Sequence, residues 1–176
     1  MGSLLIVTGP PGAGKSTVAR VIADRSESSV LIEGDAFFAF LRRGAMQPWL
    51  PEARVQNEVV TGAAAAAAGR YAAGGFTTVY DGVVGPWFLP LFAAATGVST
   101  LDYAVLLPSV ERCVDRVATR QDHGFSDDSA TRKMHGEFTS AEIDRRHVFA
   151  DPPDQPDDAA DLVIAAAQSG SLAYDS

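Results

Sequence analysis

A glycine-rich stretch near the start of the sequence, GPPGAGKST at residues 9–17, has the residue types and spacing of a phosphate-binding loop. It matches the pattern G-x-x-x-x-G-K-[ST], with Gly9, Gly14, Lys15 and Ser16 at the fixed positions. Glycines let backbone N–H groups turn toward phosphate oxygens, the lysine can reach the β and γ phosphates, and the serine hydroxyl can ligate Mg²⁺. A glycine turn with a chance lysine is the alternative, but the chain has only one other lysine. We therefore predict that nucleotide phosphates bind at Gly9, Pro10, Pro11, Gly12, Ala13, Gly14, Lys15, Ser16 and Thr17.

Two aspartates stand at the ends of apolar segments that have the composition of buried strands. Asp35 follows SVLIEG (29–34), and Asp81 lies at the end of TTVYDG (77–82). In open α/β sheets ligands bind beyond the carboxyl ends of the strands, so both carboxylates should face the phosphate site. Asp35 could accept the proton of an acceptor hydroxyl or help to hold Mg²⁺, and the alternative is a helix cap. Asp81 could hold Mg²⁺ together with Ser16, and the alternative is an Asp-Gly turn.

Three arginines recur at every fourth residue, which puts Arg112, Arg116 and Arg120 on one face of a predicted helix. Arg120 stands at the edge of a polar break, and we predict a lid at about 121–129 that closes over the nucleotide. Because lid arginines stabilise charge on the transferring phosphoryl group, Arg120 is a candidate catalytic residue and nucleotide ligand. Arg116 is a second candidate nucleotide ligand, with a solvated helix face as the alternative. Arg112 is expected to be solvated.

Aromatic residues and arginines gather between Asp35 and the third predicted strand, and again just after that strand. Both tryptophans of the chain are here, and each follows a proline. Aromatic walls with one or two arginines suit a partly apolar, hydroxylated small molecule, although each of these aromatics could instead be a core residue. The candidate acceptor-binding residues are Asp35, Phe38, Trp49, Arg54, Asp81 and Trp87.

Strands and helices must alternate for these residues to meet. Short runs rich in Leu, Ile and Val predict strands, and apolar residues at helical spacing predict helices. The alternation indicates parallel strands with right-handed crossovers and helices on both faces. We predict one α/β domain over 1–176, with a P-loop NTPase-type parallel five-stranded sheet and a lid segment. The predicted strands are 3–9, 29–34, 77–82, 102–108 and 145–150, and the predicted helices are 14–25, 35–43, 52–73, 86–97, 109–121, a helix ending at about 141, and 157–168.

Composition and charge narrow the class of protein. The chain has 176 residues, 47% of them hydrophobic, which suits one globular domain. Its net charge is −8, and the tail from Asp151 holds six acids and no base, which argues against nucleic-acid binding and predicts a solvated acidic face or linker. No apolar run is long enough to span a membrane, and the N-terminal apolar run is interpreted as a strand rather than a signal peptide. The single cysteine fits the cytoplasm, and the three scattered histidines lack metal-ligand spacing.

Several stretches together resemble one group of enzymes. GPPGAGKSTVAR, followed by IEGDAFF and then PWL, resembles the gluconate kinase and shikimate kinase group, and it is similar to chloramphenicol phosphotransferase. ERCVDRVATRQDHGF and MHGEFTSAE resemble the helix, lid and return helix of the gluconate kinases. The resemblance implies ATP and Mg²⁺ as cofactors, Lys15 and Ser16 on the phosphates and Mg²⁺, Asp35 as base and Arg120 as lid arginine. The sequence DGVVGPW lacks the serine or arginine signatures of that group, which leaves the acceptor open.

The expected function is the transfer of the γ-phosphoryl group of ATP to a hydroxyl of a small molecule, such as a sugar acid or an antibiotic. A switch-type GTPase is excluded because the only asparagine, Asn57, is not part of an Asn-Lys-x-Asp motif. A nucleoside or nucleotide kinase is the first alternative, although Gly85 stands where adenylate-type kinases have an arginine. A regulatory module that binds ATP without turnover is the second, and Asp35 and the lid arginines argue against it.

Overall fold

The computed structural model describes residues 2–119 and 128–175, and its centre is a sheet with five parallel strands. The strand order is β2-β3-β1-β4-β5, which confirms the predicted parallel sheet of the P-loop NTPase type. A sixth strand, β6, pairs antiparallel with β4 and was not predicted, because three residues are too few for a strand pattern. The strands are β1 (Ser3–Thr8), β2 (Ser29–Glu33), β3 (Thr77–Asp81), β4 (Thr100–Leu107), β5 (Val148–Ala150) and β6 (Ala173–Asp175).

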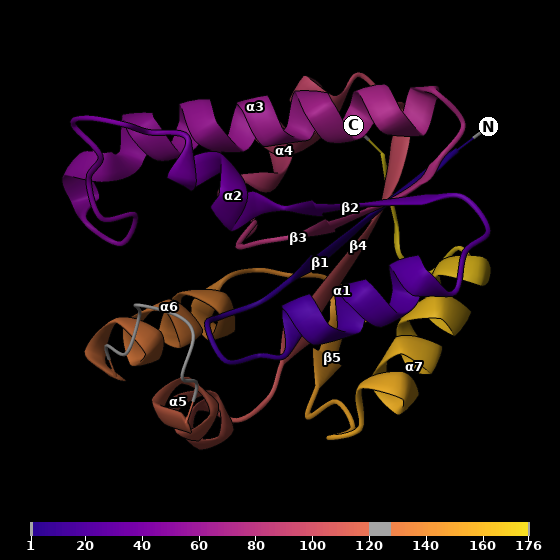
Figure 1. The fold of residues 1–176 in the computed structure, drawn as a ribbon. Helices are drawn as coiled ribbons and strands as arrows, with labels where there is room; N and C mark the ends of the chain where they lie inside the picture. Colours follow the sequence, from indigo (N-terminus) through magenta and orange to yellow (C-terminus); the bar gives the residue numbers. More distant parts are fainter. Residues whose placement is uncertain (1, 120–127, 176) are drawn as a thin grey trace.

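Helices cover both faces of this sheet (Figure 1). On one face α3 (Arg54–Ala73) and α4 (Leu89–Thr96) pack against each other, and on the other α1 (Lys15–Asp24) packs against α7 (Pro156–Gln168). Each face has its own buried apolar cluster. Gly69, which follows the alanine run of α3, allows close packing, since a Cβ at Gly69 would lie 1.8 Å from the Thr96 carbonyl oxygen in α4.

The helices nearest the carboxyl ends of the strands are α2 (Gly34–Ala39), α5 (Val110–Thr119) and α6 (Asp128–Ser140). Helices α5 and α6 pack against each other (Figure 1). Arg120 and most of the predicted lid at about 121–129 lie outside the described residues, and the last two residues of the lid's predicted range begin α6. A short 3-10 helix (Pro51–Ala53) leads into α3. No helix in the described ranges is long and apolar enough to cross a membrane.

Several predicted elements are shorter in the structure, and two of them differ in a way that concerns the site. The helix predicted over 35–43 ends at Ala39. The strand predicted over 145–150 is a 3-10 helix (Arg145–His147) followed by β5, because the Asp144 side chain accepts a hydrogen bond from the Arg146 N–H at 3.2 Å and turns the chain.

The two ends of the described chain lie at the amino side of the sheet. Strand β1 begins at Ser3, and Asp175 in β6 pairs with Thr100, the first residue of β4. Figure 1 marks both ends near the same side of the molecule, away from α2, α5 and α6. The loops that follow β1, β2, β3 and β4 therefore converge at the opposite edge.

Candidate functional site

The glycine-rich loop joins the end of β1 to the start of α1, as the motif predicts. Three of its glycines have positive φ, namely Gly9 (145°), Gly12 (77°) and Gly14 (95°). A Cβ at Gly9 would lie 2.1 Å from the Leu106 carbonyl oxygen, and a Cβ at Gly12 would lie 2.2 Å from that of Cys113. These glycines are therefore required both by backbone conformation and by the close packing of the loop against β4 and α5.

Lys15 and the N-terminus of α1 provide positive charge at this loop. The Lys15 ammonium donates a hydrogen bond to the Pro10 carbonyl oxygen at 3.0 Å, so the side chain folds back across the loop. The helix is preceded by Gly14, which has no side chain to cap it. The N–H groups of its first turn can therefore bind an anion, which is the arrangement expected of a phosphate site.

Asp81 is a buried carboxylate beside these groups. It ends β3, only 7% of its surface is exposed, and its Oδ1 has no hydrogen-bond partner. Burial raises the pKa of Asp81, and the nearby Lys15 charge and Ser16 hydroxyl oppose that shift. A buried carboxylate oxygen without a partner, next to a serine hydroxyl, is a donor set that fits Mg²⁺. Within residues 2–119 and 128–175, no group of three or more His, Cys, Asp and Glu is placed to hold a metal ion.

Asp35 lies exposed in the first turn of α2, directly after β2. The N-cap residue of this helix is Glu33, so the interpretation of Asp35 as the helix cap is wrong. Burial raises the pKa of Tyr80, and the charges of Asp35 and Asp81 raise it further, so the three side chains share one region.

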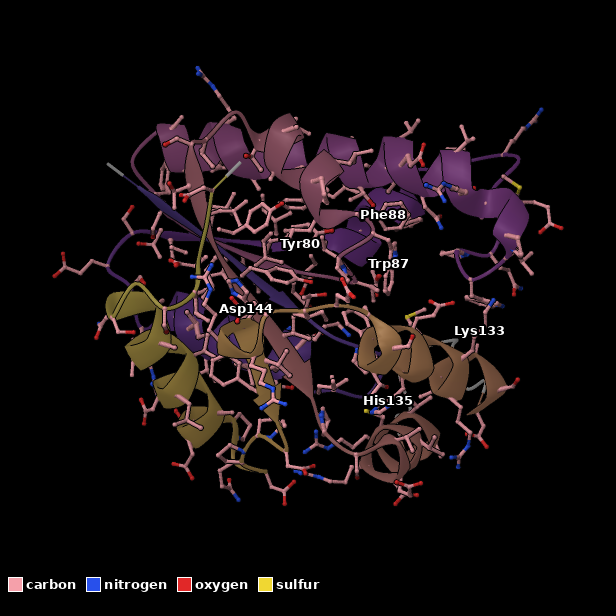
Figure 2. The ribbon with its side chains drawn as sticks, turned by 180° about the vertical axis from the view of Figure 1, so that it is seen from behind. Tyr80, Trp87, Phe88, Lys133, His135 and Asp144 are labelled. Atoms are coloured by element: carbon pink, nitrogen blue, oxygen red, sulfur yellow. The ribbon has the colours of Figure 1, made fainter. Side chains whose placement is uncertain are left out.

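The Tyr80 hydroxyl fills the space between two glycines of this region. A Cβ at Gly34 would lie 2.4 Å from the Tyr80 Oη, and a Cβ at Gly82 would lie 2.8 Å from it. Figure 2 shows Tyr80 inside the molecule, between the helices of the two faces. No motif in the sequence points to Tyr80, although Gly34 and Gly82, which flank the two aspartates, were a signal for close packing there.

The loop that follows Asp81 is held by two buried side chains. The Val84 N–H donates to the Thr8 Oγ1 at 2.8 Å, and the Val84 carbonyl oxygen accepts from the Tyr103 hydroxyl at 2.8 Å. Thr8 is the last residue of β1, directly before the glycine-rich loop, and Tyr103 is in β4. We call these two contacts the Val84 clamp. They fix the position of the loop relative to the phosphate site.

The predicted acceptor residues are only partly brought together. The Trp87 ring packs 5.2 Å from Phe138 of α6 and is 40% exposed, between α3 and α6 (Figure 2). Phe38 and Trp49 are half-buried. Arg54 is exposed and pairs with Glu58 at 3.0 Å on the surface of α3. No contact recorded among the described residues joins Arg54 to Asp35 or Asp81.

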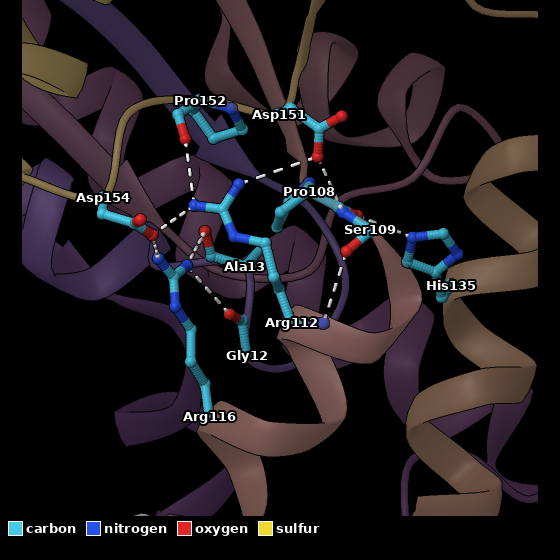
Figure 3. A network of polar contacts seen from close by, with 10 residues as sticks. All are labelled: Gly12, Ala13, Pro108, Ser109, Arg112, Arg116, His135, Asp151, Pro152 and Asp154. Atoms are coloured by element: carbon cyan, nitrogen blue, oxygen red, sulfur yellow. Dashed lines mark hydrogen bonds and ion pairs between the residues drawn. The ribbon is translucent and has the colours of Figure 1, made fainter.

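A pocket of about 280 Å³ opens beside the glycine-rich loop, on the side of β4 and α5. Arg116 lies at this pocket (Figure 3). Its Nη1 is 3.4 Å from the carbonyl oxygens of Gly12 and Ala13, and its Nη2 is 3.0 Å from Asp154 Oδ1. The pocket is lined by Ala13, Gly14, Thr17, Val18, Leu106, Arg116, Thr119, Pro152, Pro153, Asp154, Pro156 and Ala159.

One sequence interpretation changes here. Arg112, expected to be solvated, bonds to Asp154 and, at 3.2 Å, to the Pro152 carbonyl oxygen (Figure 3). The six acids of the tail are exposed, as expected of a solvated face, although the tail also contributes Pro152, Pro153, Asp154, Pro156 and Ala159 to the pocket. The sequence analysis missed Asp154 because its arginine partners are remote in sequence. The four-residue spacing of those arginines was the available signal.

The fold and the phosphate loop define a P-loop domain. Residues 4–141 match the model of the family described as AAA domain, and the chain belongs to this family. No curated protein matches the chain.

Several solved structures have the same fold and are kinases. An unliganded sugar kinase from Janibacter sp. HTCC2649 superposes with a TM-score of 0.71 at 19% identity, covering 96% of this chain and 95% of that one. Shikimate kinase from Acinetobacter baumannii, in complex with shikimate, gives 0.64 at 19% identity, covering 98% and 96%. A gluconokinase from Sinorhizobium meliloti 1021 gives 0.59 at 20% identity, covering 97% and 91%. The predicted resemblance to this group is confirmed at the level of the fold.

Proposed function

We propose that this protein is an ATP-dependent kinase, a single domain acting in the cytoplasm, that transfers the γ-phosphoryl group to a hydroxyl of a small molecule. The observation that carries the proposal is the arrangement of three strand ends. Strand β3 lies between β1 and β2 in the sheet. The phosphate loop follows β1, Asp81 ends β3, and Asp35 follows β2. A phosphate site, a metal-competent carboxylate and an exposed carboxylate therefore follow one another along one edge.

The nucleotide has one orientation that suits this edge. The pocket beside Arg116 lies on the β4 side of the loop, and a purine base can enter it between the guanidinium and the prolines. The triphosphate then runs along the loop toward β3, which brings the γ-phosphoryl group to the side of Asp81 and Asp35. The acceptor binds on that side, with Phe38, Trp49, Arg54 and Trp87 as its candidate contacts.

Each group has a defined task in phosphoryl transfer. Lys15 and the N–H groups of α1 stabilise the negative charge of the phosphates. Asp35 orients the acceptor hydroxyl and takes its proton late in the transfer. Ser16 and Asp81 hold Mg²⁺, which supplies charge neutralisation when bound. Arg120, outside the described residues, is the proposed lid arginine.

A panel of acceptors tests the proposal. Sugars, sugar acids, antibiotics, nucleosides and shikimate-like acids are incubated with Mg²⁺ and ATP, and both ADP and phosphorylated product are measured. We expect product with at least one non-nucleoside hydroxyl compound, and none with the Lys15→Ala variant. Product from nucleosides alone would establish a nucleoside kinase instead. Tight ATP binding without product from any acceptor would favour a regulatory module, and absence of ATP binding would refute the proposal.

A further inference from the structure

The Arg116 side chain lies directly on the phosphate loop, beside the proposed base pocket. A Cβ at Gly14 would lie 3.4 Å from its Nη1, and the same nitrogen is 3.4 Å from the Gly12 and Ala13 carbonyl oxygens. The other terminal nitrogen, Nη2, bonds to Asp154 at 3.0 Å. The guanidinium is thus fixed at both ends, by the loop at one and by Asp154 at the other (Figure 3).

Asp154 is itself held in place by a second arginine. Arg112, one helical turn before Arg116 on the same face of α5, donates to the same Asp154 Oδ1 and also to the Pro152 carbonyl oxygen. Arg112 and then Arg116 lower the pKa of Asp154, so its carboxylate stays ionised at neutral pH. The guanidinium of Arg116 is therefore charge-compensated where it lies.

The Arg116 guanidinium could bind either a phosphate group or the aromatic base of the nucleotide. Its existing contacts make it better suited to the base. Phosphate needs free N–H donors and net positive charge, and both are reduced at Arg116 by Asp154 and the loop carbonyls. An aromatic base needs only the flat face of a guanidinium, and Arg116 is one of the residues that line the pocket.

We propose that Asp154 is a positioning residue for the base of the nucleotide: it holds the Arg116 guanidinium against the phosphate loop so that the base stacks on it. This inference rests on the proposed function, because it requires that nucleotide phosphates bind the loop. It assigns a task in substrate recognition to an acid that the charge pattern of the sequence classifies as part of a solvated face. We expect Asp154 to strengthen the binding of the base and to have no effect on the binding of the phosphates.

Binding of two ligands that differ in the base separates these contributions. The dissociation constants of ATP and of inorganic tripolyphosphate, each with Mg²⁺, are measured by calorimetry for the wild-type protein, Asp154→Asn and Asp154→Glu. Asp154→Asn should weaken ATP binding by about 3- to 30-fold, the range of a cation–π contact, and leave tripolyphosphate binding unchanged. Asp154→Glu should recover part of the loss. The matched control is Asp157→Asn, since Asp157 also pairs with an arginine, Arg25, but does not line the pocket.

The other outcomes contradict the inference in different ways. Equal weakening of both ligands would mean that Asp154 supports the loop or the fold rather than the base. Tighter ATP binding would mean that Asp154 competes with the nucleotide for Arg116. Unchanged binding of both would leave Asp154 without a role in recognition. If the wild-type protein binds neither ligand, the proposed function itself fails, and the inference fails with it.

Discussion

At the scale of single residues, Asp81 links the stability of the protein to its proposed activity. Its carboxylate is buried at the end of β3, and one oxygen lacks a hydrogen-bond partner. An unsatisfied buried acceptor costs free energy in the folded state, and the same oxygen is the one available to a metal ion. Optimal stability and metal binding therefore favour different side chains at this position.

Asp81→Asn should accordingly make the protein more stable and less active. Burial raises the pKa of Asp81 in the folded state, so folding favours the protonated carboxyl. The ionised carboxylate therefore destabilises the folded protein. This destabilisation develops as the pH rises from the ordinary pKa of an aspartate to the raised pKa. The variant should gain about 1–2 kcal/mol in the free energy of unfolding at neutral pH, and the gain should shrink near about pH 4. Urea unfolding at both pH values measures this, together with Mg²⁺-dependent ATP binding. A variant less stable than the wild type at neutral pH would contradict it.

Asp35→Asn separates the proposed base from a metal ligand. General-base assistance contributes about 10²- to 10⁴-fold, so kcat should fall by about that factor while ATP affinity stays close to that of the wild type. Stability should change little, because Asp35 is exposed and does not cap α2. Steady-state kinetics and calorimetry give the two quantities. Loss of Mg²⁺-dependent ATP binding would instead assign Asp35 to the metal.

At the scale of elements, the Val84 clamp shows how neighbouring strands share one loop. Thr8 in β1 and Tyr103 in β4 satisfy both backbone groups of Val84, which follows β3 by three residues. The loop carries Trp87 toward α6, so its position affects the proposed acceptor side.

Thr8→Val should therefore weaken both the fold and acceptor binding. The substitution keeps the shape of the side chain but leaves the buried Val84 N–H without an acceptor, which costs about 1–3 kcal/mol in the free energy of unfolding. The KM for the acceptor should rise more than the KM for ATP, because the displaced loop faces the acceptor. Thr100→Val is the control, since the Thr100 hydroxyl bonds Asp175 on the exposed edge of the sheet. Equal changes in both KM values, or none, would contradict the specific effect on the acceptor.

The elements also show which features the sequence could predict. The phosphate loop and the strands before Asp35 and Asp81 were predicted because their signals lie within a few neighbouring residues. The bond from Arg116 to Asp154 spans 38 positions and depends on how α5 packs against the loop after β5, so no local pattern encodes it. Strand β6 was missed because its three residues are too few for a strand pattern, and it forms only by pairing with the remote β4.

At the scale of the whole molecule, the two edges of the sheet carry different tasks. The carboxyl edge collects the candidate site, whereas the amino edge carries β6 and the ends of the described chain.

His147 lies on the path from α6 to β5 and is 4% exposed. Its Nδ1 is 2.9 Å from the Tyr103 carbonyl oxygen, so the residue that clamps Val84 with its hydroxyl also anchors His147.

The stability of the whole protein should therefore fall on mild acidification. Burial lowers the pKa of His147, an effect that Arg146 reinforces, while the bond to Tyr103 and the charge of Asp144 oppose it. Because the unfolded state binds the proton more readily, stability is complete above the ordinary histidine value of about 6.5 and is lost as the pH falls below it. Urea unfolding at about pH 7.5 and pH 5.5 should show this loss, and His147→Gln should reduce it. An identical pH dependence in the variant would exclude His147 as its source.

The position of Ser3 and Asp175 at the amino side of the sheet has a practical consequence for handling the molecule. A tag, a fluorophore or a surface linker attached at either end projects from the side opposite the glycine-rich loop, so it leaves the route to that loop open. Immobilised through either terminus, the protein presents its candidate site outward to the solution.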